Sequence, residues 1–277
     1  MPYQTIDTHV HFWIYSKTRD AWITDDMKVL QQDYLPEHLM LNLKRNAVDG
    51  CVAIQVSQEE VETRFMVELS KTHDIIKGVV GWIDLRADNI DEKLASFSEN
   101  SIIKGYRHIV QAEPDDFLLR TDFQRGVHAL KQYNYTYDIL IYPSQLKSAL
   151  DFVSKLPDQK LIIDHCAKPD IKNKNIDDWK KWIQEIAQHP NVYCKVSGLF
   201  TEANWKGWAA SDFYPYLDVV FEAFGIDRVM FGSDWPVILL SGIYVQWKSL
   251  LEKYMEMSNQ EDKEKFFGLN AVQFYNL

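Results

Sequence analysis

Two histidines separated by one residue, His9 and His11, give the most specific chemical signal in the sequence. They stand at the end of a β-branched run that predicts a strand from Ile6 to His11. Side chains alternate along a strand, so residues two apart point to the same face. Because neutral imidazole is a standard ligand for zinc and related metals, the pair predicts a metal site. The alternative is a pair of core histidines that only form hydrogen bonds.

Two further predicted strands, Leu161–His165 and Val229–Asp234, end in residues of the same chemical kind. If eight strands close into a barrel, the last strand lies beside the first, so Asp234 can face the two N-terminal histidines. His165 would approach from the other side. The predicted metal ligands are therefore His9, His11, His165 and Asp234. The same four groups could instead hold an oxyanion electrostatically.

The predicted fourth strand, Ile102–Val110, contains Arg107 and His108, with Gln111 just beyond it. Alternation along a regular strand would send only one of the first two side chains inward, whereas a bulge could deliver both. Arg107 can clamp a carboxylate or carbonyl oxygen, and His108 can donate a hydrogen bond to a substrate oxygen. The alternative for Arg107 is a salt bridge between loops.

A repeated strand-and-helix pattern would bring these residues together. Dividing 277 residues by eight gives about 35 per unit, the size of one strand plus one helix in an eightfold barrel. The remaining predicted strands are Val52–Val56, Gly78–Leu85, Tyr137–Tyr142 and Val192–Ser197. Helical patterns cover Glu59–Thr72 and Ser144–Leu156, and a third helix would be capped by Ser211 and ended by Gly225. The glycine-rich phosphate turns of open α/β sheets are missing, so we predict a single (β/α)8 (TIM) barrel domain over residues 1–277.

Three long segments lie on the strand-to-helix side, where barrel enzymes carry their active sites: Trp13–Gln32, Gln111–Thr121 and Leu199–Ala210. Five of the nine tryptophans fall in the loops of this side, namely Trp13, Trp22, Trp205, Trp208 and Trp235. Aromatic faces beside a few polar groups suit a sugar ring, so we predict substrate contacts from Trp13, Trp22 and Trp235. The alternative is that some of these rings only pack the loops together.

Composition excludes several classes of protein. With 40 acidic and 30 basic side chains, the formal charge of −10 argues against a nucleic-acid partner. Three cysteines are too few for a disulfide scaffold, and Cys166 is expected to turn away from the face that His165 uses. Neither a secretory signal nor a membrane-spanning stretch is evident, so we expect a cytoplasmic protein with no membrane partner. Oligomeric state is left open.

Five motifs occur in the order of a known family: IDTHVHFW, IKGYRHIVQAEPDDFL, LIIDHCAKP, VYCKVSGL and FGSDWPV. With them the chain resembles the amidohydrolase-2 branch of the amidohydrolase superfamily, and more narrowly the metal-dependent hydrolases that include sugar lactonases such as L-fuconolactonase. The similarity extends from Ile6 to the end of the chain. It implies a (β/α)8 barrel with His9, His11, His165 and Asp234 at the superfamily's metal positions.

The resemblance implies a hydrolase that opens a sugar-acid lactone by attack of activated water. Asp234 would be the general base, with His108 and His165 as further catalytic residues and Arg107, Gln111 and Lys195 as substrate-binding residues. One divalent ion, Zn²⁺, is expected, because no lysine suits the carboxylated bridge of binuclear members; some lactonases of this branch act without metal. An acidic product would also need nearby cations, to which Lys168 can contribute. The alternatives are a cyclic-amide hydrolase, a decarboxylase on the same scaffold, or a barrel that only binds sugar acids.

Overall fold

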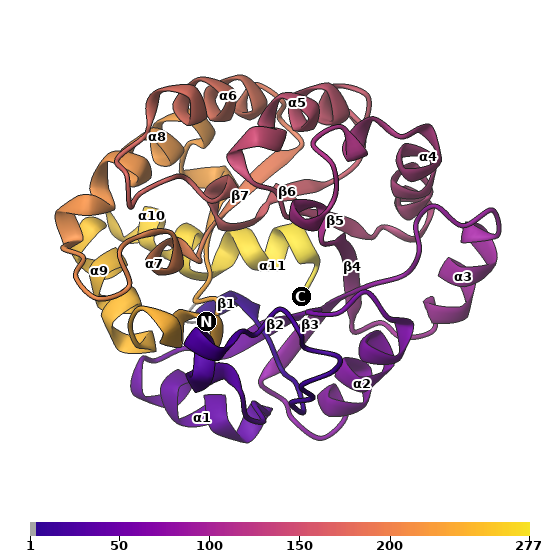
Figure 1. Ribbon diagram of the computed structural model, residues 1–277, viewed down its shortest axis with the longest axis horizontal. Helices are drawn as coiled ribbons and strands as arrows, with labels where there is room; N and C mark the ends of the chain where they lie inside the picture. The colour runs from indigo at the N-terminus through magenta and orange to yellow at the C-terminus, as the bar shows by residue number, and fades with distance from the viewer. Residues whose placement is uncertain (1–3) are drawn as a thin grey trace.

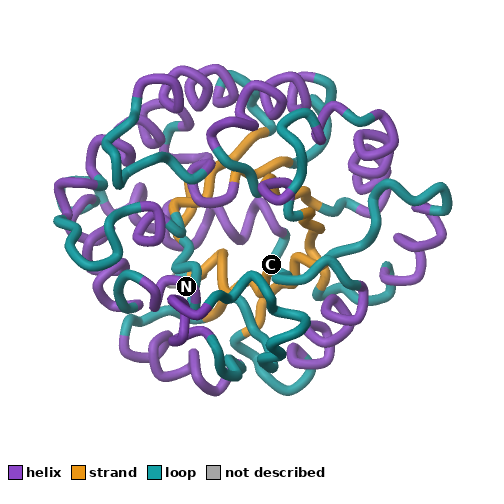
Figure 2. The backbone as a smooth tube through the Cα atoms, in the orientation of Figure 1, coloured by secondary structure: helices purple, strands orange, loops and turns teal. Residues whose placement is uncertain are grey.

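Eight parallel strands form a barrel in the computed structural model, which describes residues 4–277 (Figures 1 and 2). The strands follow chain order: β1 (Ile6–Val10), β2 (Gly50–Ile54), β3 (Ile76–Gly81), β4 (Ile103–His108), β5 (Thr136–Ile139), β6 (Leu161–Ile163), β7 (Val192–Val196) and β8 (Val229–Phe231). The ring is completed by a parallel bridge between Val10 and Trp235 and by a 2.8 Å hydrogen bond from the Asp234 amide to the His9 carbonyl. The predicted TIM barrel is confirmed. The expected domain range began at residue 1, and residues 1–3 lie outside the described part.

Helices surround the strands (Figure 1). They are α1 (Pro36–Arg45), α2 (Glu60–Ser70), α3 (Ile90–Phe97), α4 (Thr121–Ala129), α5 (Leu146–Ser154), α6 (Asp177–Ala187), α7 (Leu199–Glu202), α8 (Tyr214–Phe224), α9 (Tyr244–Tyr254), α10 (Gln260–Glu264) and α11 (Asn270–Tyr275). Gly225 ends α8 with a φ of 67°, as predicted, but Ser211 does not cap this helix, since a separate short turn occupies Ala210–Asp212. None of the helices within residues 4–277 combines the length and apolar character needed to cross a bilayer.

The last helix, α11, crosses the ring of strands (Figure 1). Its side chains Ala271, Phe274 and Tyr275 are buried against apolar residues from the barrel strands, which are Ile6, Val52, Ile54, Val80, Ile162 and Met230. Burial of two aromatic rings makes this a strongly favourable contact. These apolar side chains fill one end of the barrel interior. The polar side chains lie at the other end, where the strands have their carboxyl ends.

β6 and β8 end before the candidate residues that they were predicted to include. β6 stops at Ile163 and β8 stops at Phe231, so His165 and Asp234 both lie in the turns that follow. The four residues from His165 to Lys168 have φ between 49° and 55°, and Asp234 has a φ of 60°. A residue other than glycine costs roughly 1–2 kcal/mol in this left-handed conformation. The chain therefore stores backbone strain at the two turns that present its candidate catalytic groups.

Candidate active site

A cavity of about 280 Å³ opens among the loops at the carboxyl ends of the strands. It is lined by His11, Trp22, Val56, Arg107, Ile109, Gln111, Ala112, Leu140, His165, Lys168, Asp234 and Val237. Six of the predicted site residues are in this set, and His9 contacts three of them from below. Its lining combines charged and polar groups with Trp22 and five aliphatic side chains, Val56, Ile109, Ala112, Leu140 and Val237. Such a combination of a few polar groups and an apolar surface is typical of a small-molecule site.

His11 and Asp234 face each other across the junction of β1 and β8. The Nδ1 atom of His11 lies 2.8 Å from the carbonyl oxygen of Ile54, which places a proton on Nδ1 and leaves the Nε2 lone pair free. That Nε2 atom is 3.3 Å from Oδ1 of Asp234. Beneath them, the Asp7 carboxylate accepts a 2.8 Å hydrogen bond from the Ser233 amide and so ties β1 to the turn after β8.

His9 lies between a carboxylate and a guanidinium. Its Nδ1 atom is 3.5 Å from Oδ1 of Asp164, and its Nε2 atom is 3.2 Å from Nη1 of Arg107. Since arginine can only donate, Nε2 accepts from Arg107, while Nδ1 lies between the Asp164 carboxylate and the Lys195 ammonium, which is 3.4 Å away. Burial lowers the pKa of His9 well below its usual value, so the ring is neutral at pH 7.

His165 reaches the same place from the turn after β6. Its Nδ1 atom is 2.9 Å from the Ser197 hydroxyl, and its Nε2 atom is 3.9 Å from Oδ1 of Asp234. Burial lowers the pKa of His165 to about 4, so this ring is also neutral at pH 7. Gly198 makes the placement possible, because a Cβ atom there would lie 2.4 Å from the ring Nδ1.

Asp234 remains ionised although it is buried. Burial by itself raises the pKa of this carboxyl, but its electrostatic interactions with His165, His11 and Lys168 hold the pKa below its ordinary value. A carboxylate kept charged in a cavity, with imidazoles around it, can accept a proton from water.

Behind the cavity lies a buried ionic cluster of Arg107, Asp164, Lys195 and Asp138. Nη1 of Arg107 is 3.0 Å from Oδ2 of Asp164, and Nζ of Lys195 is 3.0 Å from Oδ1 of the same carboxylate. Lys195 also contacts Asp138, whose carboxylate accepts a 2.9 Å hydrogen bond from the Tyr275 hydroxyl of α11. Lys195 is fully buried and does not line the cavity. The structure therefore does not bring Lys195 to a place where it could hold substrate.

Comparison with known proteins places this geometry in a family. Residues 6–277 match the family described as Amidohydrolase. The chain belongs to the amidohydrolase family. It is 37% identical to an L-fucono-1,5-lactonase of Burkholderia multivorans, with 98% of this chain and 96% of that protein covered. It is 30% identical to an L-fucono-1,5-lactonase of Burkholderia ambifaria, covering 98% and 95%. A crystal structure of an amidohydrolase from Burkholderia multivorans with bound Zn superposes with a TM-score of 0.95 at 37% identity, covering 99% of both chains.

Membership in the amidohydrolase family makes this protein a hydrolase, and its histidines and carboxylates suit the family's metal chemistry. The ligand atoms of His9, His11 and Asp234 lie within 4.8 Å of one another, as do those of His9, Asp164 and His165. Two acceptor atoms that face each other, as Nε2 of His11 and Oδ1 of Asp234 do, favour a proton or a cation between them. Imidazole and carboxylate are also the ligand types that zinc prefers. The residues present can therefore hold a divalent ion, although Arg107 already donates to the His9 Nε2 lone pair.

His108 does not reach the cavity of this amidohydrolase. The β4–β5 pairing is regular through Arg107 and His108, so the bulge that would deliver both side chains does not form here. Arg107 points inward, and His108 points outward, where its ring stacks on Phe117 at 4.8 Å between centroids. Its Nε2 atom is 2.9 Å from Glu113, and burial lowers its pKa. The surroundings are those of a packing residue, which removes the geometric basis for a catalytic role.

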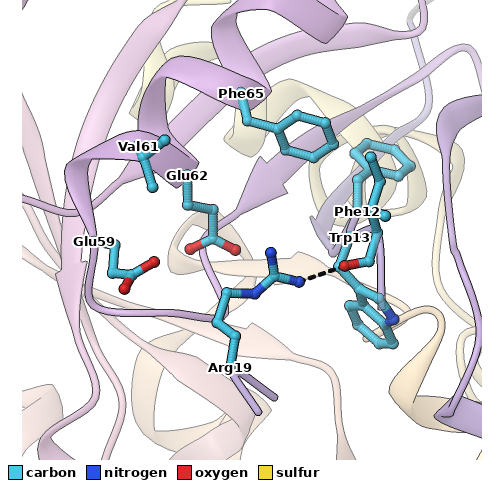
Figure 3. A pocket seen from close by; sticks show the side chains of 8 residues that line it. Phe12, Trp13, Arg19, Glu59, Val61, Glu62 and Phe65 are labelled. Carbon is cyan, nitrogen blue, oxygen red and sulfur yellow. Dashed lines mark hydrogen bonds between the residues drawn. The ribbon is translucent and has the colours of Figure 1, made fainter. Parts of the chain in front are cut away.

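Of the tryptophans expected at the substrate, Trp22 lines the cavity and the other two lie elsewhere. Trp235 is 2% exposed and packs on Tyr34, with 5.2 Å between ring centroids. Trp13 lines a separate hollow of about 190 Å³ beside α2 (Figure 3). The alternative interpretation, in which these rings pack the loops together, describes Trp13 and Trp235 better. Aliphatic side chains such as Val56, Leu140 and Val237 line the cavity where the two tryptophans were expected.

Asp164 had no assigned role in the expected reaction, and Lys168 was expected only as a cation near an acidic product. Asp164 directly precedes His165, and in a regular strand two successive side chains point to opposite faces. Because β6 ends at Ile163 and a left-handed turn follows, both carboxylate and imidazole reach the barrel interior. Lys168 lines the cavity through the same turn.

Proposed function

We propose that this amidohydrolase opens the lactone ring of a sugar acid, with Asp234 as the general base. The observation that carries the proposal is the ionised Asp234 carboxylate among three neutral or hydrogen-bonded imidazoles in a cavity of small-molecule size. The lactonase names of the two Burkholderia relatives support the same reaction.

The reaction begins when Asp234 takes a proton from a water molecule in the cavity. The water oxygen bonds to the lactone carbonyl carbon, and the electron pair of the carbonyl π bond moves to its oxygen. When this tetrahedral anion collapses, the bond from the carbonyl carbon to the ring oxygen breaks. The ring oxygen then receives the proton that Asp234 holds, which leaves a hydroxy acid and restores the ionised base.

Arg107 and Gln111 would orient the substrate. Arg107 lines the cavity and is held rigid by Asp164 and by the backbone carbonyl of Gln55. The Oε1 atom of Gln111 has no hydrogen-bond donor among residues 4–277, so it is available to accept a substrate hydroxyl. Trp22 and the aliphatic lining would contact the C–H surface of the sugar.

We further propose that one divalent ion, Zn²⁺, is held by His9, His11, His165 and Asp234. When bound, such an ion acidifies water and polarises carbonyl oxygens. His11 is already prepared for this task, because its contact with the Ile54 carbonyl fixes the tautomer that leaves Nε2 free.

A panel of sugar lactones with a pH indicator tests the proposal. We expect acid release from at least one lactone, and a rate lower by 10²–10⁴-fold for Asp234→Asn. Asparagine tolerates the positive φ of this position, so the variant should fold. Acid release by the wild type from no lactone in the panel would overturn the proposed function. A near-normal rate for Asp234→Asn would overturn the assignment of the base.

A further inference from the structure

Among residues 4–277, Arg107, Lys168 and Lys195 are cations in or near the cavity, and two of them are paired with buried carboxylates. Arg107 donates from Nη1 to Asp164 and His9 at 3.0 and 3.2 Å, and from Nη2 to the Gln55 carbonyl. Lys195 is enclosed by Asp138 and Asp164 and does not line the cavity. The positive charge of each is already paired with a buried carboxylate, so neither is free to pair with a new negative charge on the substrate.

Lys168 is different. It lines the cavity, and its side chain is 17% exposed. The nearest carboxylate is that of Glu202, with 3.8 Å between Nζ and Oε1, which is beyond hydrogen-bonding distance. The ring of Tyr142 lies 5.4 Å from the ammonium and supplies no conventional acceptor. Within residues 4–277 the Lys168 ammonium thus keeps its N–H donors for a ligand.

The backbone holds Lys168 and His165 as one unit. Both belong to the run of four left-handed residues after β6, closed by a 2.8 Å hydrogen bond from the Lys168 amide to the His165 carbonyl. Trp179 stabilises the turn by donating from Nε1 to the Cys166 carbonyl at 2.8 Å. A strained turn held in this way fixes where the two side chains leave the backbone at the cavity.

The proposed reaction creates negative charge where none was present. When Asp234 takes the water proton, the negative charge moves to the tetrahedral intermediate. After collapse Asp234 is ionised again, and the hydroxy acid loses a proton to solvent to become a carboxylate beside it. We infer that the Lys168 ammonium binds the oxygens of the lactone carbonyl carbon as they become anionic, and then the product carboxylate; this inference rests on the proposed lactone hydrolysis. Lys168 is thereby a substrate-binding residue whose contact strengthens as the reaction proceeds.

The test compares Lys168→Met with wild type, Lys168→Arg and Lys172→Met. Methionine keeps the length of the side chain and adds no backbone cost at this φ, and Lys172 is an exposed residue of the same segment. Two quantities are measured: kcat on the best lactone, and the calorimetric affinities for the matching sugar acid and for the uncharged sugar alcohol.

For Lys168→Met we expect kcat to fall by 10²–10³-fold, the usual effect of one donor to an oxyanion. Affinity for the sugar acid should fall at least tenfold, and affinity for the sugar alcohol less than threefold. Lys168→Arg should recover most of the sugar-acid affinity, and Lys172→Met should match the wild type. Equal losses for acid and alcohol, or a kcat and an acid affinity within twofold of wild type, would overturn the inference.

The binding arm separates this inference from the proposed function. If no lactone is hydrolysed, the proposed function fails, whereas a selective loss of sugar-acid affinity in Lys168→Met still supports the carboxylate contact. If lactones are hydrolysed equally by wild type and Lys168→Met, the proposed function stands and the role of Lys168 is refuted.

Discussion

The Nε2 atom of His11 lies 3.3 Å from Oδ1 of Asp234, and this short separation joins the two ends of the barrel sheet. His11 follows β1 and Asp234 follows β8, so the contact exists only when the ring of strands is complete. The geometry of the candidate active site therefore depends on closure of the barrel.

Zinc binding should depend on His11. We expect wild type to take up zinc, with a gain of about 2.7 kcal/mol in unfolding free energy at a free zinc concentration 100 times the Kd. His11→Gln should lose most of this gain, because it removes the nitrogen that faces Asp234. His73→Gln, a change outside the cavity, is the control. Metal analysis and thermal unfolding with and without a chelator measure both effects, and equal zinc uptake by His11→Gln would contradict the assignment.

Replacement of His108 should affect stability rather than catalysis. His108→Phe keeps the ring that stacks on Phe117 but loses the Nδ1 atom, which lies 3.3 Å from Nε1 of Trp82. We expect a loss of about 1–2 kcal/mol in unfolding free energy, the cost of an unpaired buried donor. The value of kcat/KM should remain within about threefold of wild type. A hundredfold fall in kcat with unchanged stability would return His108 to the catalytic residues.

Lys195 should prove essential to folding stability. Lys195→Met leaves Asp138 as a buried carboxylate without a cation and removes one of the two cations that contact Asp164. Breaking a buried ion pair in this way costs about 3–5 kcal/mol. Denaturant unfolding measures the loss. As a control, Lys131→Met breaks the exposed pair with Asp158 and should cost no more than about 1 kcal/mol. Similar losses in the two variants would show that the buried cluster contributes little.

Glu62 should make stability depend on pH. This carboxyl accepts hydrogen bonds from the Val56 and Ser57 amides, and burial raises its pKa to about 7 from 4.5. Because the folded state holds the proton more tightly, the stabilisation is complete below pH 4.5 and is lost as pH rises to about 7. The unfolding free energy of Glu62→Gln relative to that of wild type should therefore rise by about 3 kcal/mol as the pH increases across this window.

The control for this pH effect is Glu59→Gln. Glu59 is exposed, and it lines the same hollow beside α2 as Glu62 does (Figure 3). Unfolding free energies at a series of pH values measure the difference between each variant and wild type. A difference for Glu62→Gln that stays constant from pH 4.5 to 7 would contradict the shift.

The amino-acid sequence by itself determined the barrel and most of its polar site. Eight strand patterns at a spacing of about 35 residues predict the fold, and His9, His11, His165 and Asp234 follow from their places at strand ends. These signals are local: they need only the alternation of a strand and the rule that parallel strands end at the same side.

Only the tertiary structure decided how the side chains that surround this site are used. Strand pairing sends Arg107 inward and His108 outward, and the left-handed turn after β6 brings Asp164, His165 and Lys168 inward together. Trp13 and Trp235 lie outside the cavity lining because they pack against other aromatic rings. Lys195 forms ion pairs with two carboxylates, Asp138 and Asp164. Each outcome depends on partners distant in the chain, so neither composition nor periodicity contains it.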